Sequence, residues 1–508
     1  MMDFRVTETA AAVCEILADT FQEQPVDGDF VLPEYCPDVA AVLKCTVTPA
    51  VQSRQLTGDR LLTDGTVGIR VMYLDEDRRT VRCCEFSQPF SGAFSLGAVP
   101  PDAHIRLTAR VDYVNCRAIS PRRLDVHGAF TLHLLVTAAA EQSALSAIEG
   151  EGVYTRRCRV TGSVPAAFAE KPFTLNETLE PGEGRHPALW MIRSTVTPVL
   201  TECRLLMNKA IVKGKLLVKA LYALDEAGTT ERAAGEIPFS QILDLAGAEE
   251  SWICDADLSL LSAEVRMEAT QAGETPLLAV TAKVLASVWG WRAVETELVC
   301  DAYSSFCPLT LEVGEIGSTG LTAVLREERT LRQTCELPSD TVREIPDLWC
   351  EVSTAAMTGE GETLSLEGRI LWCMLVTEQN GEISYYERAE NYSLPFEDGR
   401  RDDAPEVQVL SVSFQNAGEG KVELKADLAV TRRCRSDVTR RVLTAAAPDE
   451  SAAYPPDKAA LKICYARRGE SLWDIARRCR TSVEAVTEEN RLTGDTLAAD
   501  TMLLIPLS

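Results

Sequence analysis

Thr46-Val47-Thr48-Pro49 recurs as Thr195-Val196-Thr197-Pro198, and this repetition decides how the N-terminal half of the chain is interpreted. Pro89-Phe90 recurs in the same way as Pro238-Phe239, and both intervals are 149 residues. Agreement at two separate markers indicates a repeated module.

Each copy also carries an apolar run with an internal glycine, an aromatic residue and an acidic turn. The first two copies show these features at Gly68, Tyr73 and Asp75 to Asp77, and at Gly214, Tyr222 and Asp225-Glu226. A looser third copy is marked by Pro346-Asp347, Gly368 and Pro395-Phe396. We therefore expect three copies of one unit.

The apolar runs alternate with polar residues. Gly68 to Leu74 and Ile105 to Val111 both have the period of two that is typical of a half-buried strand. Turns rich in Asp, Gly, Ser and Pro separate such segments. This pattern predicts a mainly β protein built of tandem antiparallel β-sandwich or barrel-like modules.

At 508 residues the chain is long enough for about three to four domains. The segment 1–24 has Ala10, Cys14, Leu17 and Phe21 at helical spacing, which predicts a helix that either docks on the first module or binds a partner. The predicted domains are the N-terminal segment 1–24, modules at 25–140, 150–303 and 306–446, a linker at 447–460 and a C-terminal domain at 461–508.

The chain is acidic, with a formal net charge of −25 and a pI of about 4.7. Nucleic acids and anionic lipid surfaces would be repelled, so we expect neither as a partner. The excess charge is consistent with a solvated acidic surface or with a basic protein partner. The C-terminal domain differs because its acidic and basic residues balance.

The 17 cysteines include no Cys-x-x-Cys pair. We therefore expect reduced thiols packed as small hydrophobic residues, which fits a cytosolic protein.

The N-terminus has no basic segment followed by an apolar core, and the chain has no run of 18 apolar residues. These features predict a protein that is neither exported by a standard signal nor membrane-spanning.

The C-terminal domain has a β-α-α-β order. Short strands are predicted at 463–465 and 502–505, and capping boxes at Ser471 and Thr481 predict helices at 472–479 and 482–490.

The residues from Tyr465 to Ala476, with Asn490-Arg491-Leu492 and Leu504-Ile505-Pro506, resemble a LysM domain. The resemblance implies a shallow groove for glycans that contain N-acetylglucosamine. By position, the groove would consist of Gly469, Glu470, Ser471, Leu472, Asn490, Arg491, Leu492 and Thr493. A structural role competes with this interpretation, because Gly469 and Ser471 are needed for the turn and the cap, and Leu472 is needed for a small core.

The segment from Asp29 to Val39 resembles the start of a SPOCS repeat, which occurs in clostridial spore-coat proteins that end in a LysM domain. The whole chain is similar to the SipL-like family of coat morphogenetic proteins. This resemblance implies sporulation, a location in the mother-cell cytosol at the forespore surface, and a coat ATPase of the SpoIVA type as the partner. Module two departs from the pattern, with His186-Pro187-Ala188 in place of Pro37-Asp38-Val39.

Catalytic motifs are missing from the sequence: it has no glycine-rich phosphate loop, no Gly-x-Ser-x-Gly and no His-Glu-x-x-His. The four histidines, His104, His127, His133 and His186, do not have metal-ligand spacing. We therefore predict no catalytic, cofactor-binding or metal-binding residues. The predicted function is a non-enzymatic scaffold of the spore coat, and the alternative is a peptidoglycan-binding protein that acts through its LysM domain.

Overall fold

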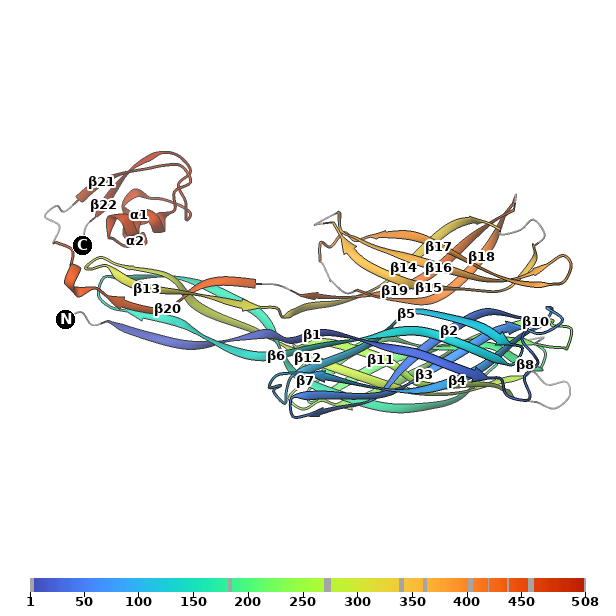
Figure 1. Cartoon of the computed structure of the whole chain (residues 1–508). Coiled ribbons are helices and arrows are strands. Elements are labelled where there is room, and N and C mark those ends of the chain that lie inside the picture. The colour runs from blue at the N-terminus through green and yellow to red at the C-terminus, as the bar shows by residue number, and fades with distance from the viewer. Residues whose placement is uncertain are drawn as a thin grey trace.

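The chain folds into an elongated, mainly β structure, here a computed structural model (Figure 1). The predicted mainly β fold of antiparallel sheets is confirmed. The structure describes residues 4–180, 185–268, 276–337, 342–359, 363–400, 405–418, 420–435, 438–455 and 461–506.

Module 1 consists of two antiparallel three-stranded sheets packed face to face. One sheet has the order β1-β6-β5 and the other has the order β2-β3-β4. The strands are β1 (Arg5–Val31), β2 (Ala41–Thr57), β3 (Arg60–Leu74), β4 (Val81–Ser95), β5 (His104–Ser120) and β6 (Arg123–Glu149). Buried residues of both sheets, among them Val71 and Leu132, share one apolar core. The two sheets remain separate, so the sandwich form of the prediction is the one observed.

Module 2 repeats this arrangement with the sheet orders β7-β12-β11 and β8-β9-β10. Its strands are β7 (Val153–Leu179), β8 (Trp190–Leu206), β9 (Lys209–Ala223), β10 (Thr230–Asp244), β11 (Ile253–Glu268) and β12 (Leu277–Ser304).

Module 3 has the same plan, except that the counterparts of the two long strands β1 and β6 are each divided in two, as β13 and β14 and as β19 and β20. Its sheets are β13-β20, β14-β19-β18 and β15-β16-β17. The strands are β13 (Leu309–Ser318), β14 (Leu321–Glu336), β15 (Val342–Thr358), β16 (Ser365–Glu378), β17 (Ile383–Pro395), β18 (Glu406–Gly418), β19 (Lys421–Arg435) and β20 (Val438–Pro448).

The repeat has a physical basis at one glycine in each of the first two modules. Gly65 lies opposite Phe90 and Gly214 lies opposite Phe239. A Cβ atom at Gly65 would stand 2.5 Å from the Phe90 ring, and one at Gly214 would stand 2.6 Å from the Phe239 ring. Gly214 of module 2 therefore corresponds to Gly65 of module 1 and not to Gly68, as the sequence had suggested. Only a glycine at this position leaves room for the phenylalanine ring.

The helix predicted in segment 1–24 is wrong, because residues 5–31 form the strand β1. This strand pairs with β6 from Arg5↔Glu149 to Val31↔Arg123. Two shifts in the register, between Thr7 and Glu8 and between Ile16 and Ala18, interrupt the strand alternation and produce the helix-like spacing in the sequence. Phe21, which was expected on the buried stripe, is 68% exposed. The pairing extends module 1 back to Arg5 and forward to Glu149.

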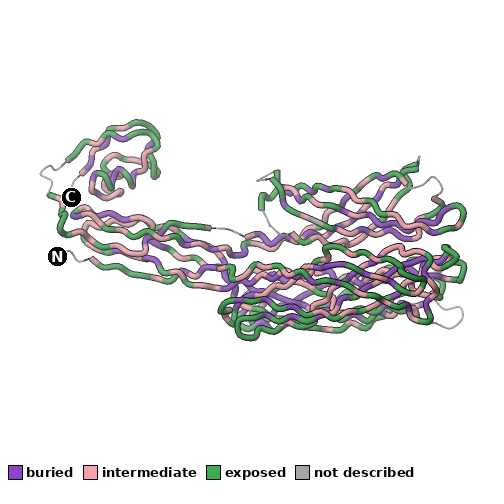
Figure 2. The backbone as a smooth tube through the Cα atoms, viewed as in Figure 1, coloured by how far each residue is buried: buried purple, intermediate pink, exposed green. Residues whose placement is uncertain are grey.

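The long first and last strands of each module continue beyond it and form a stalk of three two-stranded ribbons. The ribbons are the start of β1 with the end of β6, the start of β7 with the end of β12, and β13 with β20. Their shared core contains Ala11, Val13, Ala144, Val160, Leu298, Ile316 and Val442. Figure 1 shows the stalk on one side and the three modules, here called the head, on the other, and buried positions run through both (Figure 2).

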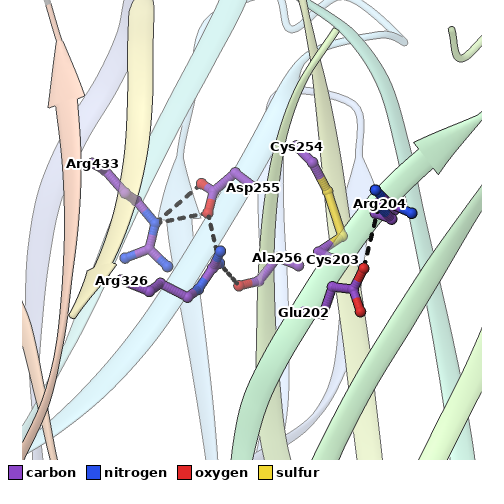
Figure 3. Close-up of a disulfide and its surroundings, with 8 residues drawn as sticks. All are labelled: Glu202, Cys203, Arg204, Cys254, Asp255, Ala256, Arg326 and Arg433. Atoms are coloured by element: carbon purple, nitrogen blue, oxygen red, sulfur yellow. Dashed lines mark hydrogen bonds and ion pairs between the residues drawn. A yellow bond between two sulfur atoms is a disulfide. The ribbon is translucent and has the colours of Figure 1, made fainter. Parts of the chain in front are cut away.

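Two different contacts join the modules within the head. An apolar cluster draws on all three modules through Met72, Leu74, Val81, Ile192, Leu221, Ala223, Leu375 and Ile383. Charged residues form the second contact, here called the ionic seam: Arg106 of module 1, Asp255 and Asp257 of module 2, and Arg326 and Arg433 of module 3. Arg433 Nε lies 3.0 Å from both Asp255 carboxylate oxygens, and Figure 3 shows Arg326 and Arg433 converging on Asp255.

The sulfur atoms of Cys203 on β8 and Cys254 on β11 form a disulfide beside this seam (Figure 3). The expectation of reduced thiols is therefore wrong for this pair, because the two strands place the Cα atoms 6.5 Å apart, within the range that a disulfide spans. Cys45 on β2 and Cys116 on β5 are among the cysteines that remain free thiols.

Candidate functional site

The C-terminal domain has the predicted β-α-α-β order. It contains β21 (Leu461–Ala466), α1 (Leu472–Cys479), α2 (Val483–Asn490) and β22 (Thr501–Pro506), and β21 pairs with β22 in antiparallel fashion. The short 3-10 helix η2 (Glu450–Ala452) precedes it. The core of the domain is small, with Ile475, Val486 and Ile505 fully buried.

The first predicted lip of the groove, residues 469–472, is a tight turn that leads into α1. Gly469 has φ +82°, which favours glycine, and it is exposed. Ser471 is the N-cap of α1: its hydroxyl accepts a hydrogen bond from the Asp474 N–H at 3.1 Å and donates to the Asp474 carboxylate at 2.6 Å. Leu472 is only 3% exposed and belongs to the core.

Glu470 is also held by local interactions. Its carboxylate accepts a hydrogen bond from the Arg467 N–H at 3.0 Å and lies 2.5 Å from Arg478 Nη1. The Arg467 N–H, and then the Arg478 guanidinium, lower the pKa of Glu470. This side chain therefore stabilises the turn as an anion.

The second predicted lip, residues 490–493, ends α2. The Asn490 side chain ties α2 to β22, because it donates to the Leu504 carbonyl and accepts from the Leu504 N–H, both at 2.7 Å. Arg491 is the left-handed C-cap with φ +50°, and its side chain is exposed. Leu492 packs against the core, and Thr493 is exposed.

The segment 495–497, which follows the second lip, is hydrogen-bonded to the first lip and so connects the two. The Leu472 N–H donates to the Asp495 carbonyl at 2.9 Å, the Leu497 N–H donates to the Glu470 carbonyl at 3.1 Å, and Ser471 forms a β-bridge with Thr496. Of the eight predicted groove residues, Gly469, Arg491 and Thr493 are exposed, whereas the remaining five are half-buried or buried and hold the two lips in shape. The exposed three are available to a ligand.

The C-terminal domain docks on the tip of the stalk, which the sequence did not indicate. The Tyr303 hydroxyl at the end of β12 donates to the Thr481 carbonyl at 2.7 Å, and Trp473 Nε1 donates to the Asp301 carboxylate at 2.8 Å. The rings of Tyr303 and Trp473 lie 4.9 Å apart, edge to face. The contact uses α1 and the α1–α2 turn, so the exposed groove residues are not part of it.

A cavity of about 790 Å³ lies between the three modules beside the ionic seam. Its lining includes Arg54, Arg106 and Arg326, each within 4.0 Å of a carboxylate of Glu170, Asp255 or Asp257. These charges neutralise one another across the module boundaries, so the cavity walls are part of the joint between modules.

Two further features bear on function. Within the described ranges, no cluster of three or more His, Cys, Asp or Glu side chains is arranged to hold a metal ion. Among the same residues, no helix has both the length and the apolar character needed to cross a lipid bilayer.

Comparison with known families identifies three segments. The family model described as SipL, SPOCS domain matches residues 38–119 and 190–268, and the LysM domain model matches residues 466–506. The resemblances to SPOCS and LysM domains are thereby confirmed, and both are binding modules. No curated protein and no solved structure matches the chain.

The matched segments have a clear place in the fold. The two SPOCS matches run from the start of β2 to β5 and from β8 to β11, so they hold one complete sheet and one strand of the other sheet in each module. Module 3 lies outside the matched residues but has the same order of strands in its sheets.

Proposed function

We propose that this chain, which carries two SipL-type SPOCS domains and a C-terminal LysM domain, is a non-enzymatic scaffold of spore-coat assembly. It would link a coat protein of the SpoIVA type to the forespore surface from the mother-cell cytosol. The finding that carries the proposal is that two kinds of binding module lie at opposite ends of one continuous β structure (Figure 1).

The joints between the parts support a rigid connector. A stalk with a buried apolar core extends from the head, and Trp473 and Tyr303 fix the LysM domain to the tip of the stalk. A partner bound to LysM would therefore be held at a defined distance from a partner bound to the head. Such spacing is useful for assembly.

A second candidate function is binding of peptidoglycan through the LysM groove. Gly469, Arg491 and Thr493 remain exposed after the LysM domain docks on the stalk, which supports the proposal that a ligand can reach the groove implied by the family. The acidic chain does not oppose this ligand, because the LysM domain itself is neutral overall.

Co-sedimentation of the full chain separates the two functions. We expect the chain to be retained by a SpoIVA-type coat protein attached to beads and not by insoluble peptidoglycan. Retention by peptidoglycan alone would overturn the scaffold proposal.

Two LysM variants locate the contact. Arg491→Asn keeps a residue that tolerates the left-handed conformation and, combined with Thr493→Glu, changes the groove surface. Glu489→Ala is the matched control, because Glu489 is an exposed residue of α2 outside the predicted groove. Loss of peptidoglycan retention in the double variant only would assign glycan binding to the groove.

A further inference from the structure

Within each module, an edge strand of one sheet lies against an edge strand of the other sheet. This line of contact, which is distinct from the ionic seam between modules, is here called the sheet seam. In module 2 this seam lies between β8 and β11, and the disulfide Cys203–Cys254 crosses it. In module 1 the corresponding strands are β2 and β5. A disulfide across such a seam joins two separate sheets covalently.

Module 1 has a pair of free cysteines across the same seam. Cys45 lies on β2 and Cys116 on β5. Cys45 belongs to the apolar core between the sheets, and Cys116 packs against that core from the other sheet. Each thiol lies close enough to the other to shift its pKa, so the two side chains are neighbours between the sheets.

The two thiols differ in a way that suits stepwise oxidation. Cys116 is half-buried, whereas Cys45 is 7% exposed. The neighbouring Cys45 thiol lowers the pKa of Cys116, while the Cys116 thiol and burial raise the pKa of Cys45. An accessible thiol with a lowered pKa beside a buried second thiol is the arrangement in which the first attacks an oxidant and the second resolves the product.

We propose that Cys45 and Cys116 are a redox site that closes into a disulfide when the protein meets an oxidising environment. The oxidant is a small-molecule disulfide such as oxidised glutathione. The Cys116 thiolate attacks one sulfur atom of the oxidant and forms a mixed disulfide, and one glutathione thiolate leaves. The Cys45 thiol then loses its proton to solvent and attacks the Cys116 sulfur atom, and the second glutathione leaves. Two protein thiols are oxidised, and one glutathione disulfide is reduced to two thiols.

Other cysteines in the molecule provide comparisons. Cys350 lies on β15, which faces β18 in module 3, and β18 contains no cysteine, so this seam cannot be bridged in the same way. Cys84 also lies in the core of module 1 and is the competing partner for Cys45. Two more pairs of neighbouring thiols, Cys158–Cys300 and Cys464–Cys479, do not lie between the two sheets of a module.

The test uses the full chain, first reduced and then incubated with oxidised glutathione under native conditions. Free thiols are alkylated, and the peptides are mapped by mass spectrometry without reduction. We expect a Cys45–Cys116 cross-link and a rise of several degrees in the unfolding temperature of the oxidised protein, because a closed loop restricts the unfolded chain.

Variants make the assignment specific. Cys116→Ser should remove both the cross-link and the rise in unfolding temperature, whereas Cys84→Ser and Cys350→Ser should remove neither. Cys45→Ser is avoided as the main variant, because a hydroxyl would enter the apolar core. Alkylation of both Cys45 and Cys116 after oxidation, under conditions in which Cys203–Cys254 forms, would overturn the proposal. A Cys45–Cys84 cross-link in the unaltered chain would overturn it as well.

Discussion

The ionic seam of the head and the core of the stalk both join the three repeats, but they do so with opposite chemistry. In the seam, Asp255 is 2% exposed and lies among arginines of modules 1 and 3. In the stalk, the shared core consists of Ala, Val, Leu and Ile side chains. Apolar contacts tolerate partial loss, whereas a buried ion pair leaves an uncompensated charge when one partner is removed. The seam therefore sets which surfaces fit together, and the stalk supplies much of the buried area that keeps them together.

The pKa of Asp255 reflects this arrangement. Burial raises the pKa of the carboxyl, but the guanidinium groups of Arg106 and Arg433 lower it by more, so that it falls to about 2. The carboxylate is therefore ionised in the folded protein at neutral pH, and it contributes stability that is lost only in strong acid, as the pH falls below about 4.

The sharpest test of the comparison is Asp255→Ala, which removes the buried carboxylate that Arg106 and Arg433 share and leaves Arg433 with Asp257 and Glu406. We expect a loss of about 3–5 kcal/mol in the free energy of unfolding, measured by urea denaturation. The matched control is Glu423→Ala, which breaks the Arg332–Glu423 pair at the surface, where the side chains are 65% and 36% exposed. The control should change the free energy by less than about 0.5 kcal/mol. Equal effects of the two variants would contradict a special role for the seam.

The corresponding change in the stalk is Leu298→Ala. Leu298 is fully buried between the ribbons, so its truncation leaves a cavity, and we expect a loss of about 2–4 kcal/mol in the same measurement. Val313→Ala, at a stalk position that is 50% exposed, is the control and should cost well under about 1 kcal/mol. If Leu298→Ala had no more effect than this control, the stalk core would not be the apolar joint described above.

His104 lies between the two joints and makes their stability depend on pH. Its ring is 3% exposed and stands edge-on to Trp291 at 5.0 Å. Burial lowers the pKa of His104 from 6.5 to about 3. At a pH between these two pKa values, the unfolded chain binds a proton at His104 that the folded chain does not. The contribution of His104 to the free energy of unfolding should therefore fall as the pH is lowered, by about 2 kcal/mol between pH 7 and pH 5.

His104→Phe removes this proton-binding group while keeping an apolar ring. In the variant, the change in the free energy of unfolding between pH 7 and pH 5 should be smaller by about 2 kcal/mol. Urea denaturation at each pH measures it. Identical slopes for the two proteins would assign the pH dependence to another group.

The smallest effect is expected at the joint between the stalk and the LysM domain. Tyr303→Phe keeps the ring contact with Trp473 and removes only the hydrogen bond to the Thr481 carbonyl, so we expect a loss of about 1 kcal/mol. Hydrogen exchange of the LysM amides in the full chain measures it. No change in exchange would indicate that the aromatic contact alone holds the domain.

The local parts of the fold were predictable from the sequence. Alternation identified the strands of the modules, and the capping box at Ser471 located α1, because both signals lie within a few residues. The predicted cap of the second helix was one residue off, since Ser482 and not Thr481 is the N-cap of α2, and the Thr481 hydroxyl donates to the Pro506 carbonyl instead. The strand β1 was missed because its partner β6 lies more than 90 residues away and because two bulges disturb its alternation. Pairing over such a distance leaves no mark in a short window of sequence.

The candidate site was predicted in part. The LysM motif predicted both lips, and the structure brings them close together, but the motif could not separate exposed residues such as Arg491 from structural ones such as Asn490. The docking of Trp473 on Tyr303 was missed, since nothing in either segment indicates the other. One signal for the seam was present: Arg106 and Asp255 are 149 residues apart, so the repeat places opposite charges at equivalent positions.

The direction of the strands in the stalk bears on how the molecule would carry load. The three ribbons run along the long axis, between the head and the LysM domain (Figure 1). Hydrogen bonds between antiparallel strands are perpendicular to the strands. A pull along this axis would thus shear many hydrogen bonds at once instead of opening them one after another. The molecule would then yield first at the small contact around Trp473, and the ribbons would survive the strain.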